Sequence, residues 1–303
     1  MKVFVALGEC MVELVPAGDG LWQMGIAGDT LNTAWYARAL LPTDWSVAYA
    51  TVIGRDPFSE MVPPFLAGAG LMTDRLVRHD TRGIGLYAVS LSKGERSFSY
   101  WRDHAAARTM ADDPGRLAWL ITGVDLLHVS GITLAILPPA GRRAMFAALA
   151  AGREAGMRVA FDPNIRLQLW ENRAAACAAV TEMAGLADIV LPSFDDEVLL
   201  FGDADPAATC ARYAMAGASM VVVKNGGGAI EAFDAGEQYH IGGLVRTVPL
   251  DTTGAGDSFN GAFLAGLLVG QSLEQAIRRA HDVASRVVGY PGALMPMEML
   301  RAR

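Results

Sequence analysis

The segment 251–263 combines, within a short stretch of chain, the groups that phosphoryl transfer needs. Gly254 and Gly256 allow a sharp turn whose backbone N–H groups can converge on an anion. We expect a helix over about 257–268, whose positive end points at the same place. Asp257 could accept the proton of an attacking hydroxyl there, or it could only cap the helix. The segment therefore favours a site that binds and transfers a phosphoryl group.

Two other classes of nucleotide-binding protein are excluded by their missing signatures. No Gly-x-x-x-x-Gly-Lys-Ser/Thr sequence occurs in the chain, so a P-loop NTPase is not indicated. The glycine cluster at 225–228 does not form a Gly-x-Gly-x-x-Gly fingerprint, which a dinucleotide-binding dehydrogenase would carry. The phosphate chemistry must therefore rest on a different scaffold.

The elements that position these residues alternate between short apolar runs and longer segments of helical period. This order predicts βαβ units and a mostly parallel sheet covered by helices on both faces. Ligands bind such sheets outside the carboxyl ends of the strands. Buried strands are predicted over 3–7, 47–52, 126–129, 159–161, 189–191 and 220–223, and helices over 30–41, 58–67, 139–155, 174–184 and 206–216.

Two stretches, 9–27 and 79–104, break this rhythm. Both are strand-like, with turns at 17–20 and 93–95. Periodicity alone is consistent with two ordinary hairpins at a sheet edge.

Composition indicates a globular α/β protein with a large core. The chain has 303 residues, of which 52% are hydrophobic, and a formal net charge of -7. This charge argues against nucleic-acid partners and a polybasic membrane surface. The apolar start at 1–7 is too short for a signal peptide, and the three cysteines lack Cys-x-x-Cys spacing, so we expect a reduced, cytoplasmic protein.

The segment 251–263 resembles the C-terminal signature of the ribokinase-like family, the carbohydrate kinases of the PfkB type. The resemblance covers essentially the whole chain and begins with 8–14 and 28–34. Within the family, the chain is most similar to the 2-keto-3-deoxygluconate kinases. Four segments carry this narrower match: 85–87, 99–102, 129–132 and 162–170.

The resemblance implies a single ribokinase-like kinase domain over 1–303, a three-layer α/β/α fold with a mostly parallel central sheet. A small β-sheet lid, formed by about 9–27 and 79–104, would close over the sugar and serve as a dimer interface. The implied reaction is ATP-dependent phosphorylation of 2-keto-3-deoxygluconate to its 6-phosphate, with Mg²⁺ as cofactor. Asp257 would accept the hydroxyl proton, and the developing charge would be held by the turn Gly254, Ala255 and Gly256.

Two arginines favour a sugar acid as the phosphoryl acceptor. Strand period places Tyr100 and Arg102 on one face, and Arg166 follows a strand that ends near Asp162. Together the two guanidinium groups could clamp a carboxylate, which a neutral sugar would not require. Arg102 could instead be a solvated edge charge, and Arg166 could balance Asp162 and Glu171.

The acceptor hydroxyls are expected at the start of the first helix. Asp29 and Asn32 share one helix face, and Gly28 precedes them with no side chain. Asp29 could also cap this helix. The family usually has two glycines here, whereas this chain has Ala27, which puts the fine specificity of the loop in doubt. Tyr87 is a further candidate, although tyrosine is simply common in strands.

The resemblance points to a nucleotide site at the ends of two later strands. A glycine turn there would let ATP lie close to the backbone, although plain hairpin chemistry would also explain it. A histidine on a C-terminal helix could contact adenine or merely lie on the surface. The expected ATP residues are Ser193, Lys224, Gly226, Gly227, Gly228, Gly254, Gly256 and His281.

The metal is expected near Asp196 and Glu197, which match the acidic element of the family. Acidic residues at a helix N-terminus are also stabilising in themselves.

Two rival functions remain. A kinase of the same family that acts on fructose or another neutral sugar would not depend on Arg102 and Arg166. A non-catalytic sugar sensor with the same fold would have no need of Asp257 beside Lys224.

Overall fold

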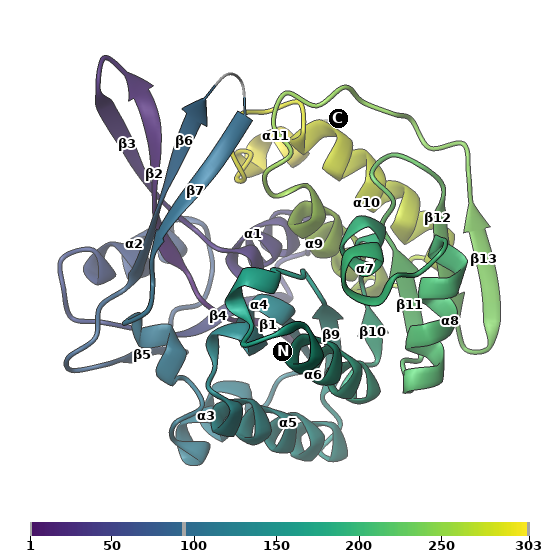
Figure 1. Ribbon diagram of the computed structural model, residues 1–303, viewed down its shortest axis with the longest axis horizontal. Coiled ribbons are helices and arrows are strands. Elements are labelled where there is room, and N and C mark those ends of the chain that lie inside the picture. The colour runs from purple at the N-terminus through teal and green to yellow at the C-terminus, as the bar shows by residue number, and fades with distance from the viewer. Residues whose placement is uncertain (1, 93–94, 302–303) are drawn as a thin grey trace.

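The computed structural model describes residues 2–92 and 95–301. Its largest element is a nine-stranded sheet in the order β13-β12-β11-β10-β9-β8-β1-β4-β5 (Figure 1). All neighbouring strands from β11 to β5 are parallel, and β12 and β13 add an antiparallel edge. The strands are β1 (Lys2–Leu7), β4 (Trp45–Ile53), β5 (Leu76–Arg78), β8 (Leu126–Ser130), β9 (Arg158–Asp162), β10 (Ile189–Val190), β11 (Met220–Val223), β12 (Ile230–Asp234) and β13 (Glu237–Ile241).

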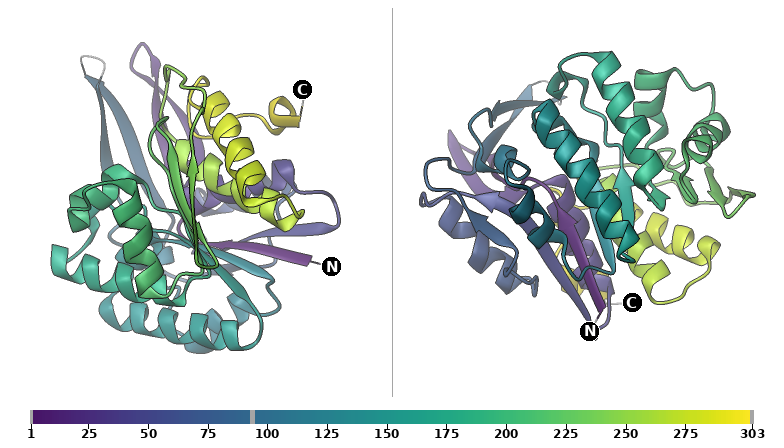
Figure 2. Two further views of the ribbon diagram at one scale, coloured as in Figure 1. Left: turned by 90° about the vertical axis from the view of Figure 1, so that its right-hand side faces the viewer. Right: turned by 90° about the horizontal axis from the view of Figure 1, so that it is seen from below.

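Helices cover both faces of this sheet, which gives the predicted three layers (Figure 2). Alternate strand residues face opposite cores: Phe4 and Ala6 pack into one cluster, Val5 and Leu7 into the other. The first core is covered by α1 (Asp29–Leu40), α2 (Val62–Gly68), α9 (Ala255–Leu268), α10 (Leu273–Val287) and α11 (Met297–Arg301). The second is covered by α3 (Pro114–Ile121), α4 (Gly131–Ile136), α5 (Pro139–Glu154), α6 (Arg173–Leu186), α7 (Phe194–Phe201) and α8 (Pro206–Ala216).

A second sheet of four strands stands at one end of the main sheet (Figure 1). It consists of β2 (Met11–Gly18), β3 (Leu21–Ala27), β6 (Gly85–Ser92) and β7 (Glu95–Trp101). The stretches 9–27 and 79–104 therefore do form one small sheet, in the order β3-β2-β6-β7. We call it the small sheet.

The predicted strands and helices of the main layers are confirmed, with two corrections. The expected helix over 58–67 is a 3₁₀ turn (Ser59–Met61) followed by α2, because Pro63 and Pro64 lack the N–H groups that a continuous α-helix would use. The helices α3, α4, α7 and α11 and the strands β5, β12 and β13 have no counterpart among the predicted ranges. Within the described residues 2–92 and 95–301, no helix has both the length and the apolar character to cross a membrane.

Candidate active site

The glycine turn leads directly into α9, and this helix begins two residues earlier than the sequence predicts. Gly254 adopts a left-handed conformation with φ of 74° and caps the helix, which begins at Ala255. A Cβ atom on Gly254 would lie 2.8 Å from the carbonyl oxygen of Ala293, so the turn requires glycine there. Asp257 therefore lies inside the first turn of the helix, and its interpretation as the helix cap is wrong.

The carboxylate of Asp257 is held by the first helix. Asn32 Nδ2 donates a hydrogen bond of 2.8 Å to Asp257 Oδ2. The two helices can approach closely because Gly261 has no side chain; a Cβ atom there would lie 2.6 Å from the carbonyl oxygen of Thr33. Burial, and then the nearby charge of Asp29, raise the pKa of Asp257 to about 8. Asp257 is thus a carboxylate that can take up a proton near neutral pH.

The loop after β9 meets the start of the first helix. Asn164 Nδ2 donates to Asp29 Oδ2 at 2.8 Å, and the backbone N–H of Asn164 donates to Asp162 Oδ1 at 3.0 Å. Asn164 has a positive φ of 33°, a conformation that asparagine tolerates better than most residues. Gly28 precedes this helix and lies against the chain that follows β1, where a Cβ atom would come within 2.4 Å of the Glu9 carbonyl oxygen. The predicted residues Gly28, Asp29 and Asn32 are therefore brought close to Asp257.

A second group of polar side chains is buried under the turn, and we call it the lysine cluster: Lys224, Asp162 and Asn260. Lys224 Nζ donates to Asp162 Oδ2 at 2.8 Å and to Asn260 Oδ1 at 3.0 Å, while Asn260 Nδ2 donates to Asp162 Oδ2 at 2.6 Å. Burial alone would raise the pKa of Asp162, but the charge of Lys224 lowers it. The Lys224 ammonium also lies against the turn, since a Cβ atom on Gly256 would be 3.4 Å from Nζ. The cluster thus fixes a cation beneath the start of α9.

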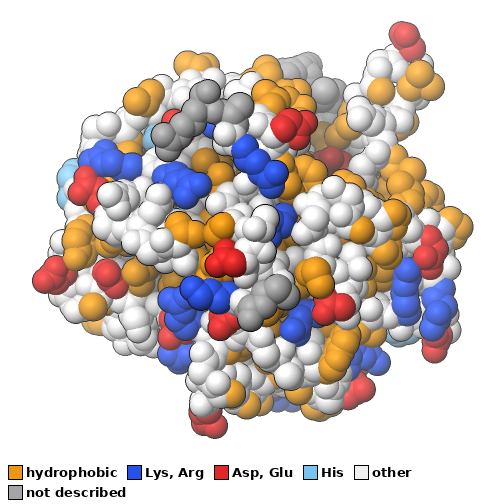
Figure 3. Space-filling view, turned by 180° about the vertical axis from the view of Figure 1, so that it is seen from behind, with side chains coloured by type: hydrophobic (Ala, Val, Ile, Leu, Met, Phe, Trp, Pro, Cys, Tyr) orange, Lys and Arg blue, Asp and Glu red, His pale blue; other side chains and the backbone are white. Residues whose placement is uncertain are grey.

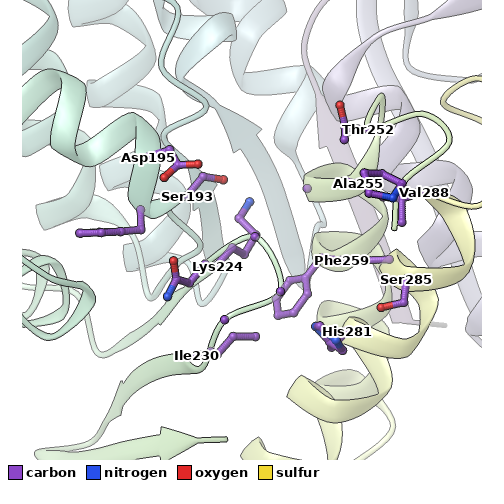
Figure 4. A pocket seen from close by; sticks show the side chains of 18 of the residues that line it. Ser193, Asp195, Lys224, Ile230, Thr252, Ala255, Phe259, His281, Ser285 and Val288 are labelled. Carbon is purple, nitrogen blue, oxygen red and sulfur yellow. The ribbon is translucent and has the colours of Figure 1, made fainter. Parts of the chain in front are cut away.

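A cavity of about 560 Å³ opens beside the lysine cluster (Figure 4). Figure 4 shows Ser193 and Lys224 on one side of it and Ser285 and His281, from α10, on the other. His281 Nε2 lies 2.8 Å from the carbonyl oxygen of Val245. The cavity walls include most of the residues expected at a nucleotide site: Ser193, Lys224, Gly226, Gly227, Gly228, Gly256 and His281.

Sequence reasoning missed several residues of this region. Asn260 lies one helical turn after Asp257, on the same face, and that spacing was the available signal. Phe259, Arg246 and Thr252 also line the cavity. The segment around Arg246 lacks regular secondary structure, so no periodicity could reveal its position.

The expected pairing of Asp196 and Glu197 at a metal is wrong for Glu197. This side chain is fully buried, and its Oε2 accepts hydrogen bonds from Arg212 Nη2 at 2.6 Å and Tyr213 Oη at 2.8 Å. Burial raises the pKa of Glu197 to about 7. Successive helical residues point about 100° apart, so Glu197 faces the core while its neighbours Asp195 and Asp196 line the cavity.

Within residues 2–92 and 95–301, no group of three or more acidic, His or Cys side chains could hold a metal by itself. One carboxylate beside the cavity is the donor set that suits Mg²⁺, which keeps several waters and is held largely by substrate phosphates. Asp196 fits this role, because it lines the cavity and is only partly engaged, by Ile165 N at 3.2 Å and Arg166 Nη1 at 3.4 Å.

Tyr87 and Tyr100 face each other across the strand pair β6 and β7, with ring centroids 5.9 Å apart. Tyr87 Oη donates to Glu13 Oε1 at 2.5 Å. Burial and the adjacent Glu13 carboxylate raise the pKa of Tyr87, and the charge of Asp257 adds to this effect. Tyr87 thus lies within electrostatic reach of Asp257, and its partner Glu13 is a residue that the sequence did not reveal.

The two arginines of the expected clamp differ in their surroundings. Arg102 is only 6% exposed and forms an ion pair with Glu9, so its interpretation as a solvated edge charge is wrong. Arg166 is partly exposed, contacts Asp196, and lines the cavity. Its alternative partners are already engaged, Asp162 with Lys224 and Glu171 with Arg142.

Comparisons with known proteins show the family of this chain. The model of the pfkB family of carbohydrate kinases matches residues 1–299. The 2-dehydro-3-deoxygluconokinase of Escherichia coli K12 is 37% identical, with 99% of both chains covered. A fructokinase of Vibrio alginolyticus is 30% identical, with 86% of this chain and 82% of the relative covered.

Among solved structures, a putative ribokinase II from E. coli in complex with ATP and Mg²⁺ superposes with a TM-score of 0.85. It is 22% identical, and the match covers 99% of this chain and 98% of that one. The ribokinase-like fold is thereby confirmed. This chain belongs to the pfkB family of carbohydrate kinases and is a phosphotransferase.

Proposed function

We propose that this protein transfers the γ-phosphoryl group of ATP to the terminal hydroxyl of 2-keto-3-deoxygluconate and releases the 6-phosphate. The observation that carries the proposal is the place of Asp257 in the first turn of α9, directly after the glycine turn, where Asn32 of α1 holds its carboxylate. The name of the E. coli relative supports this choice of sugar acid.

ATP would occupy the cavity, with its triphosphate directed to the start of α9. The N–H groups of Gly254, Ala255 and Gly256 and the positive end of α9 would stabilise the charge that develops on the transferring phosphoryl group. Lys224, fixed by Asp162, places a further positive charge beneath the turn. Asp196 would hold Mg²⁺ beside the cavity, where the ion would supply positive charge to the phosphates of ATP.

The acceptor would lie between the start of α1 and the small sheet. Asp29 and Tyr87 would contact its hydroxyls, and Asp257 would accept the proton of the attacking one; the contacts of Asp257 with Asn32 and of Asp29 with Asn164 support this arrangement. Arg102 and Arg166 would bind the carboxylate. In this proposal the whole chain is one kinase domain, and the small sheet is a lid that excludes water when it closes.

The small sheet also supports self-association. It stands clear of the body (Figure 3), and several of its large apolar side chains are exposed. Trp22 is 49% exposed and Trp101 62%. Exposed apolar surface of this kind is typical of a protein interface, and we propose a homo-oligomer that forms through the small sheet in the cytoplasm.

A coupled assay of ADP release tests the function directly. MgATP would be supplied with 2-keto-3-deoxygluconate, fructose, ribose or gluconate, for the wild type and Arg166→Ala. We expect turnover with the keto acid and a higher KM for it in the variant, because one carboxylate contact is lost. Preference for fructose would favour the neutral-sugar kinase, for which the V. alginolyticus relative provides some support. Binding without turnover would favour the sugar sensor.

A further inference from the structure

Glu9 and Arg102 occupy the junction between the two sheets. Glu9 lies between β1 of the main sheet and β2 of the small sheet. Arg102 directly follows β7, where the chain returns from the small sheet to the body. We call them the junction pair. Their ion pair therefore joins two of the places where the chain passes between the two sheets. A lid that closes would have to move about these places.

Both members are withdrawn from solvent. Glu9 is 3% exposed and Arg102 6%, and Arg102 Nη2 donates to Glu9 Oε2. The guanidinium carbon of Arg102 lies 5.7 Å from the ring centroid of Tyr100. The Glu9 carboxylate is within electrostatic reach of Asp29 at the start of α1, and of Arg108. The pair is thus placed between the proposed acceptor-binding residues of the small sheet and those of α1.

Two glycines clear the space in which the junction pair lies. A Cβ atom on Gly85 would be 2.9 Å from Glu9 Oε1 and 3.3 Å from Arg102 Cβ. A Cβ atom on Gly28 would be 2.4 Å from the Glu9 carbonyl oxygen. Because both glycines adjoin strands of the small sheet, that sheet packs directly onto the pair.

The hydrogen bonds of the pair are incomplete. Among the residues that the structure describes, Glu9 Oε1 and Arg102 Nε are buried without a hydrogen-bond partner. A buried ion pair with unsatisfied atoms contributes little net stability compared with a well-packed apolar pair. Stability alone therefore does not account for two charges at this position.

We propose that Glu9 is a positioning residue, which holds the Arg102 guanidinium at the junction so that its remaining N–H groups face the acceptor carboxylate. This inference rests on the proposed function. Glu9 itself would not touch the acceptor. Without its carboxylate, the Arg102 side chain would lose the partner that fixes it beside Tyr100, and acceptor binding would weaken while the phosphoryl-transfer groups stay in place.

A double-mutant cycle tests whether Glu9 acts through Arg102. The four proteins are wild type, Glu9→Gln, Arg102→Met and the double variant, which removes both buried charges and so leaves none unpaired. Steady-state kinetics would be measured for 2-keto-3-deoxygluconate and MgATP. We expect Glu9→Gln to raise the KM of the keto acid about tenfold, the value of one charge-assisted hydrogen bond, with kcat and the KM of MgATP changed less than about twofold.

In the Arg102→Met background, Glu9→Gln should cause no further rise in that KM. Multiplicative effects in the double variant, or a fall in kcat with an unchanged KM, would overturn the inference. Arg142→Met is the matched control, because Arg142 is also buried, paired with a glutamate and stacked on an aromatic ring, yet belongs to α5. It should leave the keto-acid KM unchanged. If the wild type prefers a neutral sugar, the proposed substrate is wrong, and the inference falls with it because no carboxylate is left for Arg102 to bind. If the wild type prefers the keto acid but Glu9→Gln leaves its KM unchanged, only the role of Glu9 is overturned.

Discussion

The lysine cluster and the junction pair are both buried groups of opposite charge beside the active site, but they are satisfied to different degrees. Lys224 and Asn260 both donate to Asp162 Oδ2, and Lys224 also donates to Asn260. In the junction pair, Glu9 Oε1 and Arg102 Nε have no partner within the described part of the chain. The lysine cluster joins strand ends of the main sheet to α9, whereas the junction pair lies between two sheets.

The pKa values of the two buried carboxyl groups, Asp162 and Glu9, also shift in opposite directions. The Lys224 charge lowers the pKa of Asp162 despite burial, while burial raises the pKa of Glu9 despite Arg102. The partners of Asp162, Lys224 first, thus more than offset the effect of its burial, whereas Arg102 only partly offsets the burial of Glu9. We infer that the nucleotide side of the site is organised before substrates bind, and that the acceptor side is adjustable.

The largest effect is expected at Asp257, which lies between the two groups. Asp257→Asn removes the proton acceptor and should lower kcat by about 10² to 10⁴-fold, the usual range for a general base. The binding of MgATP and of the keto acid, measured by calorimetry, should change little, because Asn32 can still contact the side chain. Retention of more than a tenth of wild-type turnover would exclude Asp257 as the base.

Removing the cation from each group tests whether the lysine cluster and the junction pair differ in their contribution to stability. Lys224→Met should destabilise the fold by about 3–5 kcal/mol, because Asp162 loses the cation whose charge offsets the cost of its burial. Arg102→Met should cost less, since Arg102 offsets the burial of Glu9 only in part. Urea unfolding at pH 7 would measure both values. Equal losses would contradict the distinction between the two groups.

A second variant separates stability from activity at the lysine cluster. Adding Asp162→Asn to Lys224→Met removes the buried carboxyl group that has lost its cation, and should restore most of the lost stability. It should not restore the KM of MgATP, because the cation beneath the glycine turn remains absent.

The pH dependence should reflect the position of Asp257 next to Asp29. The value of kcat/KM should rise with pH up to about 8, because Asp257 must lose its proton before it can act as a base. Asp29→Asn should move this rise to lower pH, since it removes a neighbouring negative charge that favours the protonated form. Glu182→Gln on the exposed surface of α6 removes one charge elsewhere and should leave the profile in place. A rise that stays at the same pH in Asp29→Asn would argue against this coupling.

The sequence predicted best what depends on local pattern. The alternation of strands and helices was correct because period and length are properties of a single segment, and it placed Lys224 and Arg166 at the carboxyl edge of the sheet. The glycine turn before α9 was recognisable because positive φ and close approach require glycine.

The missed residues depend on contacts between distant parts of the chain. Glu9 pairs with a residue 93 positions away, and Glu13 with one 74 positions away. No local pattern identifies such partners. Glu197 was misplaced for a related reason: three consecutive acids look equivalent in sequence, but helix geometry turns only some of them toward the cavity.

The smallest effect is expected from a substitution that touches the junction pair and not the lysine cluster. In Gly85→Ala the new methyl group would lie 2.9 Å from Glu9 Oε1, 3.1 Å from Met11 Cγ and 3.3 Å from Arg102 Cβ, so the small sheet must shift slightly. We expect a stability loss of about 1 kcal/mol and a severalfold rise in the keto-acid KM, with an unchanged KM for MgATP. Gly68→Ala in α2 is the control, because its methyl group would meet no atom within 4 Å. If Gly85→Ala changed the KM of MgATP as much as that of the keto acid, the two sides of the site would not be organised independently.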